Sequence, residues 1–264
     1  KLVKNLLTEH KIKTVYHAAA YKHVPLVEGN PLEGLNNNSI GTKLLLKECM
    51  ESDVNSFVLI STDKAVRPCS TMGVTKRLAE LLCLRMNFLS STKFITVRFG
   101  NVLNSAGSVV PLFQDQIDRG GPVTVTHEDA TRFFMSIPEA CQLIMEASAI
   151  GNGGDLYVLD MGKPVKITYL AEQMIKLSGY TPGKDIKVVF TGLRPGEKIE
   201  EELFFADENL TKTKHDKLLL SEFGQIDVDE IGGAVLALQS AVKENNREEM
   251  SRILERFRED KQMA

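Results

Sequence analysis

Apolar residues recur along the first hundred positions with two different periods. Short runs rich in β-branched and aromatic residues, typical of buried strands, occupy residues 14–20 (TVYHAAA), 56–62 (SFVLIST) and 93–99 (KFITVRF). Apolar positions at helical spacing occupy residues 2–10, 32–52 and 72–89. Strands that alternate with helices in this way predict an α/β fold built on a doubly wound parallel sheet.

After residue 104 the pattern breaks into shorter pieces. Strand-like runs occupy residues 155–159 and 186–191, and helical runs occupy residues 138–149, 167–178 and 228–258, the last with a break near Asn245 and Asn246. We therefore expect two domains. Residues 1–104 belong to the domain of the sheet, and residues 105–264 form mainly a smaller lobe, with interleaved elements of the sheet and a helical tail.

The composition is that of an ordinary globular protein and argues against several classes of function. Of the 264 residues 43% are hydrophobic and 25% are charged, and the formal net charge is −3. The chain has no excess of positive charge, so we expect no binding to nucleic acid. It also contains no run of about 20 apolar residues, so we expect no membrane contact from this segment. The cysteines show no CxxC spacing, which favours reduced thiols in the cytoplasm and no metal site: Cys49, Cys69, Cys83 and Cys141.

The stretch STDKAVRPCSTMGVTK, from Ser61 to Lys76, carries the clearest candidate chemistry. Thr62, Asp63 and Lys64 follow a predicted buried strand, and Lys76 lies in the helix that comes next. Ligands of open α/β sheets bind at the carboxyl ends of the strands. A hydroxyl, an acid and a base at that edge are the groups needed to move protons at adjacent carbons, although an isolated Thr-Asp-Lys would be an ordinary surface turn.

Seven motifs, in order, resemble the extended short-chain dehydrogenase/reductases: HAAAYKHVP (17–25), NSIGT (38–42), STDKAVRP (61–68), MGVTKR (72–77), RFGNVL (98–103), TRFFM (131–135) and RPGEK (194–198). More narrowly, they resemble bacterial UDP-N-acetylglucosamine 4,6-dehydratases of polysaccharide and capsule biosynthesis. The resemblance implies a Rossmann-type NAD-binding domain in residues 1–104 and a lobe that binds the nucleotide sugar after it. It also implies NAD as the cofactor and a UDP-sugar as the substrate.

The chain departs from the family pattern at the cofactor phosphates. No GxGxxG turn occurs in it, although such a turn holds the NAD pyrophosphate at a helix N-terminus in these folds. In the family, TVYHAAA corresponds to the fourth strand. We therefore expect the N-terminal strands and the pyrophosphate turn to be missing from these residues, and we expect weak NAD binding by this segment alone.

A second departure is Met72, which stands where the wider superfamily has the tyrosine of a YxxxK catalytic pair. A thioether cannot exchange a proton, so the proton of the sugar 4-hydroxyl must pass to another group. The membrane-anchored members of the dehydratase family are similar in having methionine here. The substitution therefore favours that branch over an inactive enzyme, and the resemblance allows a longer parent protein anchored at the cytoplasmic face of a membrane.

The resemblance implies oxidation at C4 of the sugar, loss of water across C5 and C6, and return of the hydride to C6. We assign Asp63 as the acid at the C6 hydroxyl and Lys64 as the base at C5, where a closed pocket near Lys76 favours its neutral form. Thr62 is the candidate for the hydrogen bond to the 4-hydroxyl. Lys76 is expected to contact the nicotinamide ribose and to act through its charge.

The motifs assign further contacts. Ala18, Ala19 and Ala20, with Asn38, are the cofactor candidates, although three alanines fit tight packing equally well. On the substrate side the candidates are Asn101 and Arg194 for the pyrophosphate, Glu197 for the uridine ribose, and Arg132, which is equally suited to a surface ion pair. We expect structural roles for His17 and His23.

Other functions stay open. A 4-epimerase or a C5-inverting dehydratase shares the fold, but an epimerase needs no acid–base pair for loss of water and normally keeps the tyrosine. A noncatalytic sugar-nucleotide sensor or scaffold fits Met72 and the missing glycine-rich turn. The resemblance also implies a homodimer or a higher homo-oligomer through a four-helix bundle formed by residues 32–52 and 72–89 of two copies.

Overall fold

The computed structural model describes residues 1–206, 208–222 and 227–258. Its central sheet has the strand order β1-β2-β3-β8-β12-β11. The bounds of these strands are β1 (Thr14–His17), β2 (Ser56–Ile60), β3 (Lys93–Arg98), β8 (Leu156–Leu159), β12 (Leu218–Ser221) and β11 (Leu210–Lys212). The first four are parallel, and β12 and β11 join them antiparallel. The predicted α/β fold with a mostly parallel sheet is therefore confirmed, while β11 and β12 were not predicted.

The parallel strands are shorter than the sequence pattern indicates. β1 ends at His17 and β2 ends at Ile60, so both AAA and Ser61–Thr62 lie beyond the sheet. The middle of β2, Phe57 to Leu59, is fully buried, as expected for a strand with helices on both faces. The polar residues that follow leave the ladder, which places them at the carboxyl edge of the sheet.

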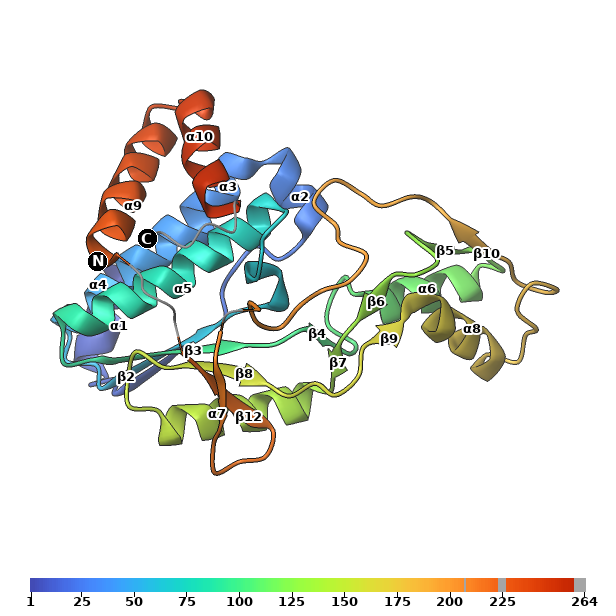
Figure 1. The fold of residues 1–264 in the computed structure, drawn as a ribbon, viewed down its shortest axis with the longest axis horizontal. Helices are drawn as coiled ribbons and strands as arrows, with labels where there is room; N and C mark the ends of the chain where they lie inside the picture. The colour runs from blue at the N-terminus through green and yellow to red at the C-terminus, as the bar shows by residue number, and fades with distance from the viewer. Residues whose placement is uncertain (207, 223–226, 259–264) are drawn as a thin grey trace. The chain divides into compact units, whose positions relative to one another are not determined.

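Helices cover both faces of this sheet (Figure 1). On one face lie α1 (Leu2–Glu9), α2 (Val24–Gly29), α3 (Pro31–Leu35), α4 (Gly41–Glu51) and α5 (Thr71–Leu89). Residues 36–40 form a π-helical turn between α3 and α4, so the predicted helix 32–52 is a run of α, π and α segments. α5 begins where the Ser70 hydroxyl accepts a hydrogen bond from the Gly73 amide at 3.0 Å. α7 (Ile137–Ile150) provides residues 143–150 on the other face.

The chain divides into two compact units whose boundaries differ from the predicted division at residue 104. The first contains residues 1–99, 143–160 and 202 onward, and the second contains residues 100–142 and 161–201. The second unit holds β4 (Asn101–Val102), β5 (Val123–Val125), β6 (Thr131–Arg132), β7 (Phe134–Met135), β9 (Val165–Lys166), β10 (Val188–Phe190), α6 (Val109–Asp118) and α8 (Ile167–Leu177). Its core joins α6, α8 and β5 through Phe113, Val123 and Ala171. The chain therefore enters and leaves this unit twice.

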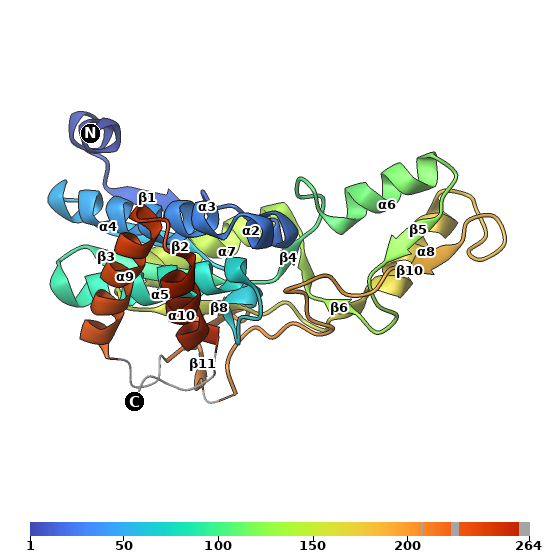
Figure 2. The same ribbon diagram turned by 90° about the horizontal axis from the view of Figure 1, so that it is seen from above.

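A helical hairpin, α9 (Val228–Lys243) and α10 (Arg247–Arg258), packs against α5 (Figure 2). The predicted break near Asn245 is confirmed, and Asn245 has a left-handed φ of 54°. Leu238 and Ile253 of the hairpin join Leu78 of α5 in one apolar cluster. The hairpin thus covers apolar residues of α5, a helix that the resemblance places in a four-helix bundle between two copies, and the oligomeric state stays a prediction. Within the part of the chain that the structure describes, no helix is long and apolar enough to cross a bilayer.

Candidate active site

The segment that follows β2, residues 61–66, is called the TDK turn here. After Ile60 the chain passes Ser61 and Thr62 and then forms a 3₁₀ turn over Asp63–Ala65. The Ser61 amide donates to the Val97 carbonyl at 2.7 Å, and the Asp63 amide donates to the Phe99 carbonyl at 3.0 Å. Both bonds go to the end of the neighbouring strand, so the turn is fixed at the carboxyl edge of the sheet.

The three predicted catalytic side chains of the TDK turn lie in contact. The Asp63 carboxylate is fully buried, and its Oδ1 accepts from Lys64 Nζ at 2.9 Å and from Thr62 Oγ1 at 2.8 Å. Asp63 Oδ2 has no hydrogen-bond partner among the described residues. Lys64 keeps 23% of its side chain exposed. A buried carboxylate thus lies between a hydroxyl and an ammonium, with one oxygen left for a ligand.

Lys76 reaches the same edge from α5. Its side chain is almost wholly buried, and Nζ donates to the Ile60 carbonyl, the last of β2, at 2.7 Å. Burial lowers the pKa of Lys76 to about 8, while the charge of Glu80, one helical turn further on, opposes the decrease. Lys76 is therefore a cation held directly beneath the start of the TDK turn.

Met72 lies one turn before Lys76 on α5. It is 3% exposed and packs with Val24 and Val27 of α2 in a small apolar cluster. Its carbonyl accepts a hydrogen bond from Thr75 Oγ1 at 2.7 Å. The position where the superfamily has tyrosine is therefore an apolar contact in this chain.

The three alanines follow β1 at the same edge of the sheet. Ala18 and Ala19 are exposed and Ala20 is half-buried. Exposed positions of this kind leave the backbone of Ala18 and Ala19 accessible from outside the chain. Their contact with NAD stays a prediction.

Asn38, in the π-helical turn, braces the loop after β1. Its Nδ2 donates to the Tyr21 carbonyl at 2.9 Å and to Thr75 Oγ1 at 3.0 Å, and its Oδ1 accepts from the Tyr21 amide at 2.7 Å. The side chain is 1% exposed. Asn38 therefore fixes the loop that carries the alanines to α5, and a direct contact with the cofactor stays a prediction.

His17 has structural contacts. Its Nε2 lies 2.9 Å from Thr42 Oγ1, and its ring centroid lies 5.8 Å from that of Phe57. Burial, followed by the charge of Lys76, lowers the pKa of His17 to about 4. A neutral imidazole with these partners supports the structural role predicted for His17, while His23 is exposed.

In the second unit, Arg194 and Glu197 lie at the two ends of a turn. The Glu197 amide donates to the Arg194 carbonyl at 3.0 Å, and Gly196 between them has a φ of 78°. Arg194 Nε lies 3.8 Å from Glu197 Oε1, and 51% of the arginine side chain is exposed. Asn101 is half-buried on β4, where its backbone N–H donates to the Phe133 carbonyl at 3.0 Å. The exposed guanidinium leaves room for a phosphate group.

Arg132 braces the second unit. Its Nη1 donates to the Thr131 and Ile199 carbonyls at 2.6 and 3.0 Å, and its Nη2 donates to the Lys198 carbonyl at 2.8 Å. Only 11% of its side chain is exposed. The guanidinium thus binds backbone next to the RPGEK turn, and binding of substrate by Arg132 stays a prediction.

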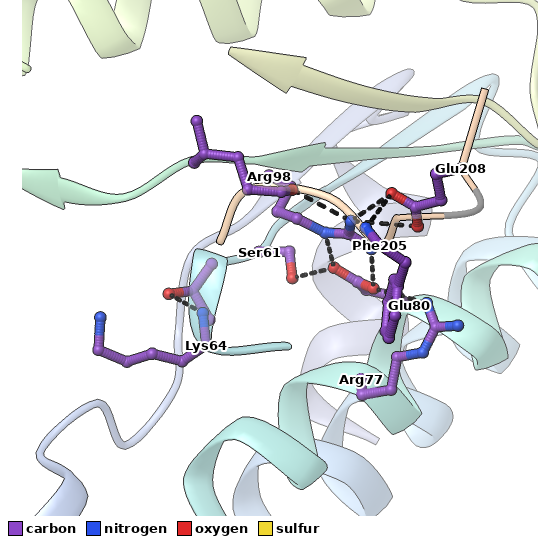
Figure 3. A network of polar contacts seen from close by, with 9 residues as sticks. Ser61, Lys64, Arg77, Glu80, Arg98, Phe205 and Glu208 are labelled. Carbon is purple, nitrogen blue, oxygen red and sulfur yellow. Dashed lines mark hydrogen bonds and ion pairs between the residues drawn. The ribbon is translucent and has the colours of Figure 1, made fainter. Parts of the chain in front are cut away.

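A buried polar network that the sequence pattern did not predict lies beside the TDK turn (Figure 3). Glu80 accepts from Ser61 Oγ at 2.6 Å and from Arg98 Nη2 at 2.8 Å. Arg98 is the largest of the fully buried side chains, and it also binds Glu208 at 2.9 Å. The signal in the sequence was a glutamate four residues after Lys76, on the same side of the helix, together with an arginine in the apolar strand 93–99.

Comparison with known proteins identifies relatives over most of the chain. A family described as polysaccharide biosynthesis protein matches residues 1–222. A capsular polysaccharide biosynthesis protein, CapD of Staphylococcus aureus, is 52% identical over 214 residues, which are 81% of this chain and 36% of that protein. A UDP-glucose 4-epimerase of Rickettsia rickettsii is 37% identical over 202 residues, 75% of this chain and 58% of the epimerase. The chain thus spans about a third of CapD.

Solved structures share the fold. Pen of Bacillus thuringiensis superposes with a TM-score of 0.77 and 32% identity, covering 89% of this chain and 77% of Pen. The dTDP-glucose 4,6-dehydratase DesIV of Streptomyces venezuelae, a double mutant with NAD bound, has a TM-score of 0.70 and 19% identity, covering 77% of this chain and 67% of DesIV. The likeness to DesIV concerns the fold alone.

Proposed function

Because the chain belongs to the polysaccharide biosynthesis protein family, we propose that it is the catalytic part of an NAD-dependent nucleotide-sugar 4,6-dehydratase. The proposed substrate is UDP-N-acetylglucosamine, and the product is a UDP-4-keto-6-deoxy-N-acetylhexosamine. The observation that carries the proposal is the contact of Thr62, Asp63 and Lys64 at the carboxyl end of β2. Loss of water next to a ketone needs an acid and a base side by side, and this turn provides both.

The residues around the edge of the sheet fit NAD. Ala18 and Ala19 are exposed there without a side chain beyond Cβ, and the buried cation Lys76 lies beneath the same edge. Ala18 to Ala20 and Lys76 would therefore hold the dinucleotide, with Asn38 fixing the loop. When bound, NAD accepts a hydride from C4 of the sugar and returns it to C6.

Lys64 and Asp63 divide the proton transfers of the elimination. Neutral Lys64 takes the C5 proton, the C5–C6 double bond forms, and the C6–O bond breaks as Asp63 protonates the leaving hydroxide to give water. Lys64 later returns its proton to C5. Over a complete turnover, the proton released from the 4-hydroxyl replaces the one that Asp63 donates. The Thr62 hydroxyl, 2.8 Å from Asp63 Oδ1, is the group that we assign to relay it.

The observed ion pair converts into this reactive form by one proton shift. Lys64 Nζ and Asp63 Oδ1 lie 2.9 Å apart, so a proton that crosses this hydrogen bond yields a neutral amine and a carboxylic acid. Asp63 Oδ2, which has no described hydrogen-bond partner, is the oxygen available to the C6 hydroxyl.

We assign substrate binding to the second unit. Arg194, exposed at the RPGEK turn, would bind the pyrophosphate with a two-pronged guanidinium, together with Asn101. Glu197 would accept hydrogen bonds from the uridine ribose. We propose the cytoplasm as the location, in a full-length parent anchored to a membrane, and a homodimer or higher homo-oligomer whose contact lies outside the residues of α5 that the hairpin covers.

The test is a product assay with UDP-N-acetylglucosamine and NAD, on a protein to which the N-terminal glycine-rich part that the resemblance leads us to expect has been added. We expect a 6-methyl signal by NMR from the wild type and none from the Asp63→Asn and Lys64→Met variants. Lys47→Met, which removes a side chain that is 66% exposed, is the matched control and should keep full activity.

The other functions predict different products. A C4 epimer without a methyl signal would replace the dehydratase proposal with an epimerase, the activity named for the Rickettsia relative. An inverted C5 centre in the methylated product would identify the C5-inverting reaction. A sugar that binds but stays unchanged would favour a noncatalytic sensor, and Met72 would then mark the lost activity.

A further inference from the structure

Glu80 connects the TDK turn to the centre of the first unit. Its carboxylate is fully buried and accepts from Ser61 Oγ at 2.6 Å, and Ser61 is the residue directly before Thr62. Arg98 binds the same carboxylate with Nε at 3.1 Å and Nη2 at 2.8 Å. A two-pronged pair of this kind fixes the orientation of both groups. The hydroxyl of Ser61 is therefore held by a rigid acceptor.

Arg98 extends the network to the segment that returns from the second unit. Its Nη1 donates to the Leu203 carbonyl at 3.2 Å and to Glu208 at 2.9 Å. The ring of Phe205, in the same segment, lies 4.7 Å from the guanidinium carbon of Arg77, and Arg77 also pairs with Glu80 at 3.2 Å. Among the residues that the structure describes, two arginines and two glutamates meet in this network.

Stability alone does not explain this cluster. Removing charges from water costs several kcal/mol for each ion, and well-packed apolar residues often serve stability as well as a buried ion pair does. What the ionic cluster adds is a defined geometry, because Ser61, Arg77 and Arg98 all point at one carboxylate (Figure 3). The cluster reaches the TDK turn through Ser61, the first residue of the turn.

Glu80 also lies one turn beyond Lys76 on α5. The groups near Lys76 are the Ile60 carbonyl of β2, His17 of β1, and Glu80 and Cys83 of α5. Among these, the carboxylate of Glu80 is buried and already paired with Arg98. Glu80 is thus shared between the side-chain hydroxyl of Ser61 in the TDK turn and the charge of Lys76.

We propose that Glu80 and Arg98 are positioning residues that hold the TDK turn and Lys76 in register for proton transfer. The inference rests on the proposed dehydratase function. Neither residue touches the reacting atoms: Glu80 acts through Ser61 and Lys76, and Arg98 acts by fixing Glu80 and the segment around Leu203.

Two amide variants of the full-length protein separate this role from simple stability. Glu80→Gln and Glu208→Gln each remove one carboxylate from Arg98, but only Glu80 contacts Ser61 and lies near Lys76. We expect Glu80→Gln to lower kcat on the order of tenfold with little change in KM, because small misplacements of catalytic groups are costly. We expect Glu208→Gln to keep kcat near the wild type.

The pH profile gives a second readout. Activity that needs charged Lys76 decreases as the pH rises past the pKa of about 8. The charge of Glu80 raises the pKa of Lys76, so its loss lowers that pKa. The activity of Glu80→Gln should therefore begin to decrease at a lower pH than that of the wild type, whereas the activity of Glu208→Gln should decrease at the same pH as that of the wild type. An unchanged profile and kcat in folded Glu80→Gln, or equal shifts in both variants, would overturn the proposal.

Ser61→Ala keeps the inference testable if Glu80→Gln fails to fold. This variant deletes the hydroxyl that joins Glu80 to the turn and leaves the Glu80–Arg98 pair intact. We expect lower kcat, a Tm lowered by a few degrees because a buried hydrogen bond is lost, and faster amide hydrogen exchange in residues 61–66. The exchange readout does not depend on activity, so a wild type that forms no methyl product would refute the proposed function, whereas unchanged exchange and kcat in Ser61→Ala would refute the positioning role.

Discussion

Single residues at the candidate site differ sharply in what their polar atoms contact. The hydrogen-bonding capacity of Asn38 is used within the chain, whereas Asp63 Oδ2 has no described partner. A buried side chain with all its partners holds structure, and one with a free oxygen at a sheet edge is available to a ligand. This contrast separates bracing residues from candidates for chemistry among residues of similar type.

Met72 is the first residue to test, since the thioether has no proton to exchange. We expect Met72→Leu to keep kcat within about threefold and to cost less than about 1.5 kcal/mol of unfolding free energy, because this swap conserves volume and apolar character. Product NMR and denaturant unfolding are the measurements. A hundredfold loss of kcat in a stable Met72→Leu variant would show that the sulfur itself takes part.

His17 gives a pH dependence of stability with a defined sign. Its pKa is about 4 in the folded chain against 6.5 ordinarily. As the pH falls below 6.5 the unfolded chain binds this proton first, so the stability that His17 contributes is present above pH 6.5 and is lost progressively down to about pH 4. We expect His17→Gln to flatten the decrease of Tm in this window. His23→Gln, at an exposed position, is the control, and equal effects of both variants would contradict the prediction.

At the scale of elements, the start of α5 is the part of the fold on which the candidate site depends most directly. α5 carries Met72, Lys76 and Glu80 on successive turns, and its first turn packs against the TDK turn. Lys64 O would lie 2.2 Å from a Cβ at Gly73, and Pro68 Cβ would lie at 3.0 Å. Only a glycine lets the helix approach the backbone of the turn this closely.

We therefore expect Gly73→Ala to lower both stability and kcat, although alanine favours a helix by about 1 kcal/mol over glycine. The methyl group must push the Lys64 carbonyl away and misplace Asp63 and Lys64. Gly233→Ala in α9 is the matched control, because a Cβ there meets nothing within 4 Å and should stabilise the chain slightly. Thermal unfolding and product formation are the measurements, and the two variants should shift Tm in opposite directions. An equal gain in stability from Gly73→Ala and Gly233→Ala would refute the close contact at Gly73.

At the scale of the whole molecule, the hairpin α9–α10 completes the core of the first unit from the far end of the chain. Ile231, Leu238, Ile253 and Leu254 lie in the same apolar cluster as residues of α5. Gln239 also accepts a hydrogen bond from Lys43 of α4 at 2.9 Å. The match to the family covers residues 1–222, so this hairpin lies outside the matched residues.

Two leucines on α9 test the hairpin. Leu238 is 1% exposed and Leu236 is 62% exposed. We expect Leu238→Ala to cost about 2–5 kcal/mol of unfolding free energy and Leu236→Ala less than about 0.5 kcal/mol. Amide exchange of the hairpin should also be independent of protein concentration. Exchange that becomes faster as the protein self-associates would mean that a second copy displaces the hairpin from α5.

The order of helices and strands and the place of the TDK turn follow from the amino-acid pattern alone. Apolar periodicity reports which face of a short segment is buried, and residues that follow a buried parallel strand must emerge at its carboxyl edge. For this reason the fold class and the grouping of Thr62, Asp63 and Lys64 were predictable without coordinates.

Only the tertiary structure decided what the isolated charged residues do. Arg98 and Glu80 lie 18 positions apart, and Arg98 and Glu208 lie 110 positions apart, so no local period links them. The same holds for the backbone contacts of Arg132 and for the hairpin on α5. Hydrogen bonds and apolar contacts act over a few ångströms in space, whatever the separation in sequence. Contacts between residues far apart in the sequence therefore depend on the tertiary fold.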